Sequence, residues 1–150
     1  MNIDLLRKQI ASDEGKKYEV YLCSENHPTV GIGHLITADD PEYGQPIGTE
    51  VSEDRVNEAF DSDIRTTLED CRIIFDDFDG MPEEIQLCLA NMAFQLGRPT
   101  LTKFRKSVAY ANDGDWSSLA HEILDSRWAQ EQTPHRANRI SDRIKAVADG

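Results

Sequence analysis

Apolar residues recur at helical spacing at the start of the chain and through most of its second half. Ile3, Leu6 and Ile10 lie three or four positions apart and predict a short amphipathic helix. A second apolar stripe, preceded by the N-cap candidate Ser52, predicts a long helix over residues 52–71. The same spacing predicts further helices over residues 82–96, 101–112, 116–126 and 134–148.

Residues that favour helix ends flank two of these segments. Residues 76–80 break the helical pattern, Pro82 fits the first turn of the next helix, and Gly97 ends that helix. Thr133 is the expected cap of the last helix, with Pro134 at its first position.

Alternation of apolar and polar residues replaces the helical spacing after the first helix. Residues 18–22 alternate and residues 29–34 follow a turn, which predicts a small β-hairpin or meander. Residues 37–50 are rich in Gly, Pro and Asp and predict a loop, with a last short strand near Ile47.

These elements together predict an α+β fold in a single domain spanning residues 1–150. We expect a small N-terminal lobe over about residues 1–51 with a short antiparallel sheet, and a connecting helix over about 52–72. An all-helical lobe over about 73–150 completes the chain. A chain of this length buries roughly 68–70% of its unfolded surface and needs no disulfide or metal for a core. A cleft between the lobes is the expected place of a site.

The charge of the chain is acidic and unevenly distributed. Its 16 Lys and Arg residues against 28 Asp and Glu residues give a net charge of −12. Residues 39–84 hold 16 acids and three bases, whereas residues 98–150 hold nine bases and seven acids. Since affinity for phosphate comes mainly from clustered Lys and Arg, nucleic acid and anionic lipid are disfavoured as partners. Only the second segment suits an anionic polymer.

The cysteines and the N-terminus bear on the compartment. Cys23, Cys71 and Cys88 form an odd set without CxxC spacing, which predicts free thiols in a reducing compartment. The N-terminus lacks the apolar run of a secretory signal, and no stretch approaches the ~20 apolar residues of a membrane span. We therefore expect a chain that is made and kept inside a cell, without membrane insertion.

Two short patterns that suggest a bound nucleotide or metal are incomplete. Gly31 and Gly33 begin a nucleotide-binding pattern, but the third glycine position holds Ile36. Close backbone approach or a tight turn is the favoured role of these glycines. Residues 76–80 resemble a calcium loop but lack carboxylates at the first and last ligand positions. We expect neither a metal nor a cofactor.

Glu14 is the acid with the most distinctive place, because it lies where a helix ends and a hairpin begins. Cleavage of a glycosidic bond needs a carboxylic acid to protonate the leaving oxygen and a second group on the other face of the sugar. Cys23 and Thr29 are the hairpin's polar groups that converge with Glu14 in such an arrangement. On spacing alone, a surface or capping role is favoured for each of the three.

Two basic residues have alternative interpretations. His34 suits a general base, but we favour an ion pair or hydrogen bond with Asp63 that fixes the hairpin to the long helix. Arg136 belongs to a basic stripe with Arg139 and Arg143, for which solvation is the simplest interpretation.

The order and spacing of these residues resemble a known family. Glu14, eight residues, Cys23, five residues and Thr29 resemble the catalytic hairpin of the T-even-type phage lysozymes, glycoside hydrolase family 24. Other segments that resemble this family follow in family order, at residues 30–35 (VGIGHL), 91–97 (NMAFQLG), 126–128 (SRW) and 132–137 (QTPHRA). The resemblance therefore covers almost the whole chain and implies a lysozyme-like fold.

The resemblance implies a role for each candidate. Glu14 would be the general acid, Thr29 would help to hold the attacking water, and His34 with Asp63 would form a structural ion pair. Arg136 would partner Glu14 across the cleft. Sugar-binding positions are implied for Leu35, Phe94, Ser107 and Glu122, the last where the family often has Asn.

Two features of this chain differ from the pattern of the best-known members. Cys23 stands where they carry Asp, although the family pattern admits Cys. A thiol offers a polarisable nucleophile or base and not a fixed negative charge at neutral pH, so we expect an active variant. Trp128 and Thr133 are one residue further apart than in the family pattern, which predicts a local difference between them.

The resemblance also implies the substrate and the biology. The expected enzyme is an endolysin, a muramidase that cleaves the β-1,4 bond between N-acetylmuramic acid and N-acetylglucosamine in peptidoglycan and lyses the host. We expect a bacteriolytic monomer that accumulates in the host cytoplasm and reaches the cell wall after a holin permeabilises the membrane. The alternatives are a catalytically silent wall-binding or virion structural module, and an enzyme that acts on chitin-type polymers or as a lytic transglycosylase.

Overall fold

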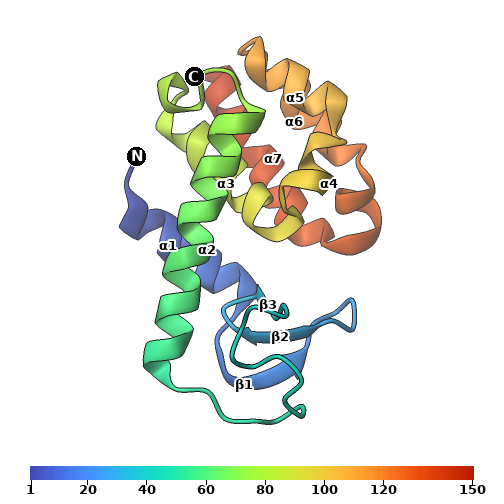
Figure 1. Ribbon diagram of the computed structural model, residues 1–150. Coiled ribbons are helices and arrows are strands. Elements are labelled where there is room, and N and C mark those ends of the chain that lie inside the picture. Colours follow the sequence, from blue (N-terminus) through green and yellow to red (C-terminus); the bar gives the residue numbers. More distant parts are fainter. The chain divides into compact units, whose positions relative to one another are not determined.

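The computed structural model describes the backbone of residues 1–150 and every side chain except that of Glu131. The chain forms two compact units, Arg7–Thr66 and a larger one made of Met1–Leu6 with Thr67–Gly150. Figure 1 shows the small sheet of the first unit and the helices of the second. The fold is therefore α+β, as the sequence predicts.

The smaller unit is built around a three-stranded antiparallel sheet of order β1-β2-β3. Helix α1(Ile3–Glu14) leads into strand β1(Lys17–Leu22), and β2(Pro28–Gly31) and β3(His34–Leu35) follow. The predicted meander is thereby confirmed. The first part of the long helix α2(Glu53–Ile74) completes this unit.

The strand register decides which side chains share a face of the sheet. Val20 is opposite Val30, and both side chains are buried in the core. Tyr21 is opposite Thr29, and Thr29 is opposite Leu35. Because successive side chains point to opposite faces, Tyr21, Thr29 and Leu35 form one cross-strand row away from the valines.

The strand predicted near Ile47 does not form. Ile47 is 55% exposed, and residues 48–51 join β1 only through an isolated bridge between Glu19 and Glu50 and through backbone hydrogen bonds with Tyr18 and Val20, among the residues that the structure describes. Ser52 caps α2 as predicted, because its Oγ accepts a hydrogen bond of 3.1 Å from the Arg55 backbone N–H.

The larger unit is helical and is centred on its last helix. Its elements are η1(Phe78–Gly80), α3(Glu83–Leu96), α4(Arg98–Thr102), α5(Arg105–Asn112), α6(Trp116–Leu124), η2(Trp128–Gln132) and α7(Pro134–Asp149). Helix α7, red in Figure 1, packs against α3, α6 and η2. Ala137, Ile140 and Ile144 on α7 are fully buried, as their helical spacing predicts.

Three predicted helix ends differ in detail in the structure. The helix predicted over residues 101–112 is two helices, because Phe104 has a non-helical ψ of 61° that separates α4 from α5. Pro82 is the N-cap of α3 and not part of its first turn, although Gly97 ends that helix as predicted. Thr133 occupies the cap position of α7, but its side chain makes no capping hydrogen bond.

A wide helical turn joins Trp128 to Thr133. The Thr133 backbone N–H donates to the Trp128 carbonyl, five residues back, at 3.0 Å. Such a π-type turn spends one residue more than an α-helical turn. Gln95 joins both ends of it, since its Oε1 accepts from Trp128 Nε1 at 2.9 Å and its Nε2 donates to Thr133 Oγ1 at 3.2 Å.

Candidate active site

Glu14 is the last residue of α1 and lies against the turn between β2 and β3. The helix ends there because the Gly15 N–H donates to the Ala11 carbonyl and Gly15 turns the chain at a φ of +75°. A Cβ on Gly33 would lie 2.9 Å from Glu14 Oε2, closer than real Cβ atoms approach oxygen. The Glu14 carboxyl group therefore occupies a place that only a glycine at position 33 leaves open.

The second glycine of the pair has a matching role on the core side. Gly31 has a φ of +64°, and a Cβ there would lie 2.9 Å from Val56 Cγ1 of α2. Both glycines thus allow close approach of a neighbour at a left-handed backbone position. The interpretation of these glycines as structural residues is confirmed.

Cys23 and Thr29 are tied to the same backbone carbonyl. The Cys23 backbone N–H donates to the His27 carbonyl at 3.0 Å, and Thr29 Oγ1 donates to that same oxygen at 2.8 Å. Asn26 makes the tight turn between them possible at a φ of +62°. Cys23 is half-buried, whereas the hydroxyl-bearing Thr29 is only 1% exposed.

Tyr21 joins this group, although the sequence did not point to it. Burial raises the pKa of the Tyr21 hydroxyl, a hydrogen bond from the Gly33 backbone lowers it, and the nearby acidic groups of Glu14 and Cys23 raise it, with a net increase. Lys17 Nζ lies 4.4 Å from the centre of the Tyr21 ring. The alternating pattern of β1 and the register with Thr29 point to Tyr21. An aromatic residue in a strand, however, usually serves packing.

His34 lies between two carboxylates in the smaller unit. Its Nδ1 is 2.7 Å from Asp63 Oδ2 and its Nε2 is 3.0 Å from Asp40 Oδ2. The hydrogen bond with Asp63 raises the pKa of His34, burial lowers it, and the charges of both carboxylates raise it, so that the net shift is upward. Arg55 continues the network by pairing with Asp40 at 3.1 Å and with Glu42 at 3.0 Å.

With both ring nitrogens engaged by carboxylates, His34 has the surroundings of an ion pair and not those of a general base. The structure brings His34 and Asp63 together as the sequence predicts. The contribution of Asp40 was not predicted, because the loop that carries it has no periodic pattern.

The larger unit holds the other predicted site residues. Arg136 is 8% exposed, and its Nε donates to Asn91 Oδ1 at 2.8 Å. Ser107 is buried and Glu122 is half-buried, and both line a hollow between α5 and α6. Phe94 is half-buried on α3, whereas Leu35 of the smaller unit is 53% exposed. The predicted pairing of Arg136 with Glu14 stays a prediction, as do the sugar-binding roles.

The remaining thiols and the acidic groups offer no further site. Burial raises the pKa of Cys71 and of Cys88 to about 12, so both are unreactive. Among the side chains that the structure describes, no three His, Cys, Asp or Glu residues are grouped to hold a metal ion. None of the described helices is both long and apolar enough to cross a membrane.

Glu14 at the end of α1 and Cys23 and Thr29 around the turn between β1 and β2 belong to the same small unit. A glycosidase needs a carboxylic acid and a second group on the other face of the sugar. The family model of phage lysozymes matches residues 11–143. The chain belongs to the phage lysozyme family, and it is a glycoside hydrolase of the lysozyme type.

The named relatives include one that the match covers almost completely and two much longer proteins. A probable T4-type lysozyme 2 from Dictyostelium discoideum is 29% identical, and the match covers 92% of each chain. The pre-baseplate central spike protein Gp5 of Enterobacteria phage T4 is also 29% identical, over 91% of this chain but 27% of its own length. The peptidoglycan hydrolase gp36 of Pseudomonas phage phiKMV is 26% identical, over 92% of this chain and 15% of its own length.

Proposed function

We propose that this enzyme hydrolyses the β-1,4 bond between N-acetylmuramic acid and N-acetylglucosamine in peptidoglycan. The observation that carries the proposal is the seating of the Glu14 carboxyl group against Gly33, beside the turn that joins Cys23 to Thr29. The relative described as a peptidoglycan hydrolase supports the substrate.

Glu14 is the general acid of the proposed reaction. It protonates the leaving glycosidic oxygen, while charge develops on the sugar in an oxocarbenium-like transition state. A fixed position matters because proton transfer needs hydrogen-bond distance to the leaving oxygen. Gly33, which has no Cβ, leaves room for the carboxyl group beside the turn between β2 and β3.

Thr29 acts on the water that attacks the sugar. Its hydroxyl proton is committed to the His27 carbonyl at 2.8 Å. The Thr29 oxygen can therefore accept a hydrogen bond from water. This hydrogen bond orients a lone pair of the water toward the sugar that it attacks. Cys23, held to the same carbonyl, acts on that water or on the sugar as a polarisable nucleophile or base.

The biological role that we propose is host lysis by a monomeric endolysin that passes from the host cytoplasm through a holin-permeabilised membrane. A second role is favoured by one observation. The central spike protein of phage T4 contains a segment similar to nearly all of this chain within a protein several times longer. An enzyme that opens the wall as part of a virion is therefore the alternative, with the same chemistry.

A clearing assay on chloroform-treated Gram-negative cells tests the activity. We expect the wild type to clear the suspension and Glu14→Gln to be slower by about 1,000-fold or more, in keeping with the loss of a general acid. Mass spectrometry of the products must show reducing muramic ends, because anhydro-muramic ends would assign a lytic transglycosylase. An unchanged Glu14→Gln enzyme, or no clearing by the wild type, would overturn the proposal.

A further inference from the structure

One stretch of this acidic chain contains no acid at all. Residues 85–112 hold no Asp or Glu, although the whole chain has 28. The same stretch contains Arg98, Lys103, Arg105 and Lys106. A positive segment within a chain of net charge −12 creates a local field that the total charge conceals.

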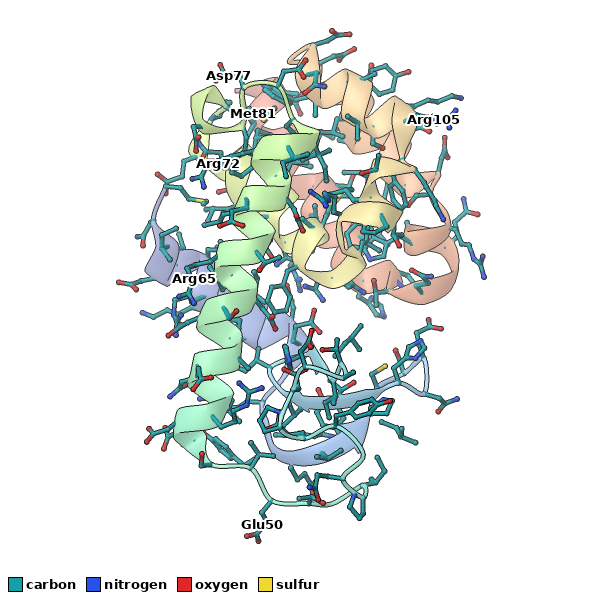
Figure 2. All side chains as sticks on the ribbon, viewed as in Figure 1. Glu50, Arg65, Arg72, Asp77, Met81 and Arg105 are labelled. Carbon is teal, nitrogen blue, oxygen red and sulfur yellow. The ribbon has the colours of Figure 1, made fainter. Side chains whose placement is uncertain are left out.

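The fold gathers three of these charges around a hollow of about 320 Å³ in the larger unit. Lys103, Arg105 and Lys106 come from the junction of α4 and α5, and Arg127 comes from the segment after α6. Figure 2 labels Arg105 on the outer side of α5. We call this hollow the basic pocket; its lining is Lys103, Phe104, Arg105, Lys106, Ser107, Glu122, Ser126 and Arg127.

The lining of the basic pocket suits a carboxylate. Among the described side chains that line it, four are cationic and Glu122 alone is anionic. The N-terminal end of α5 lies at Arg105 and adds the positive end of its helix dipole. Guanidinium groups bind carboxylates through two parallel hydrogen bonds, and Arg105 supplies such a group at the pocket.

We propose that the basic pocket binds the carboxylate groups of the peptides attached to the glycan strands. This inference rests on the proposed function and names the part of the substrate that the larger unit recognises. N-acetylated sugars are uncharged apart from the lactyl carboxyl of muramic acid, which is amide-linked where a peptide is attached. The peptides therefore carry the anionic groups. Glu122 offers one place for the amino group of a diamino acid, which such peptides also contain.

The net charge of the chain disfavours a densely charged partner as the occupant. A net charge of −12 repels a nucleic acid or an anionic lipid surface, whose charges are closely spaced. A short peptide with a few carboxylates meets only the basic lining. The hollow of about 320 Å³ is also of the size that small ligands occupy.

The test compares two substrates and two charge reversals. The wild type, Lys106→Glu and Lys145→Glu each hydrolyse two substrates. The first is glycan strands with native peptides. In the second, the peptide carboxyls have been converted to primary amides. Lys145 is the matched control, because it is an exposed lysine of the larger unit that does not line the basic pocket. The readout is kcat/KM from the release of reducing ends.

On native strands we expect Lys106→Glu to lower kcat/KM by about tenfold and Lys145→Glu to change it by less than about twofold. On amidated strands the wild type and Lys106→Glu should be equal within about twofold, because no carboxylate remains to be bound. An equal loss for Lys106→Glu on both substrates, or no loss on either, would overturn the inference and leave the hydrolase assignment intact. Wild-type enzyme that cleaves neither substrate would instead refute the proposed function.

Discussion

At the scale of single residues, backbone geometry decides which groups the candidate site brings together. Gly33 has a φ of +65°, and its missing Cβ leaves room for the Glu14 carboxyl group. His27 contributes only its carbonyl, yet that oxygen joins the Cys23 backbone to the Thr29 hydroxyl. Each of these constraints acts through backbone geometry, so no charge or motif score reveals it.

Gly33→Ala should separate this positional effect from ordinary backbone strain. The new methyl would displace the Glu14 carboxyl group, and a misplacement of about 1 Å costs about 100-fold in rate, so we expect kcat to fall by about that factor. Gly44→Ala is the matched control, because Gly44 has a φ of +79° and nothing within 4 Å of its added Cβ. Both variants should lose about 1–2 kcal/mol of unfolding free energy, but Gly44→Ala should keep kcat within about twofold. Equal kcat values for the two variants would contradict the role of Gly33.

Cys23 should be the one thiol that reagents modify in the native protein. It is half-buried, whereas Cys71 and Cys88 are buried and their pKa is raised to about 12. We expect iodoacetamide to add one group, verified by intact mass, and to inactivate the wild type. Cys23→Asp should stay active and resist the reagent. Full activity after verified alkylation of Cys23 would remove this residue from the mechanism.

At the scale of elements, a few polar side chains fix how neighbouring segments join. His34 of β3 is bound to Asp63 of α2 at 2.7 Å and to Asp40 of the intervening loop at 3.0 Å. Gln95 of α3 holds both ends of the η2 turn through Trp128 and Thr133. Since α7 begins directly after Thr133, this turn sets the register that brings Arg136 to Asn91.

The stability that His34 supplies should depend on pH with a defined sign. Its pKa is raised in the folded state, chiefly by the hydrogen bond with Asp63, so its contribution is full below about pH 6.5 and is lost as pH rises through the folded pKa. Burial raises the pKa of Asp40, but the Thr37 backbone N–H and His34 lower it further, so its contribution is lost only in acid.

The gap in unfolding free energy between the wild type and His34→Asn should therefore be largest between about pH 4 and 6.5 and shrink at higher pH. Denaturant unfolding at several pH values measures it. His121→Asn is the control, because His121 and Asp125 are 79% and 61% exposed at 3.6 Å and should give no such gap. A gap that widens above pH 7 would contradict the raised pKa.

Gln95→Ala should destabilise the fold through the η2 turn. It removes the partner of the buried Trp128 indole N–H and of the Thr133 hydroxyl, and an unsatisfied buried group costs about 1–3 kcal/mol. Gln130→Ala truncates an exposed side chain in the same turn and should stay within about 0.5 kcal/mol of the wild type. Chemical denaturation distinguishes the two, and similar losses would show that the hydrogen bonds of Gln95 contribute nothing.

The sequence predicts helices far better than it predicts their ends or the site. Helical spacing located α2 and α7 because each buries one apolar stripe over many turns. It missed the break at Phe104, where a single backbone angle ends one helix and starts the next. Tyr21 was missed because its role comes from the register with Thr29 and from Gly33, which no local pattern encodes.

At the scale of the whole molecule, the distribution of charged residues affects how the enzyme meets its substrate. The chain is acidic mainly between residues 39 and 84, and four of its 16 basic residues line one hollow of the larger unit. Peptidoglycan is itself anionic, so the proposed substrate is repelled by most of the surface and attracted by one pocket. The repulsion acts over a longer distance than the attraction in the pocket, so changes in salt concentration can separate them.

Salt should therefore affect this enzyme in the opposite sense to a basic lysozyme. Electrostatic interactions between exposed charges extend about 30 Å at 0.01 M salt but only about 10 Å at 0.1 M. Added salt therefore removes the long-range repulsion first and weakens contacts in the basic pocket less. We expect the clearing rate to stay level or rise between about 10 and 100 mM salt. Lys106→Glu should show a steeper rise, because it adds repulsion where the wild type has attraction. A rate that is highest at the lowest salt and falls steeply would mean that long-range attraction dominates, contrary to a net charge of −12.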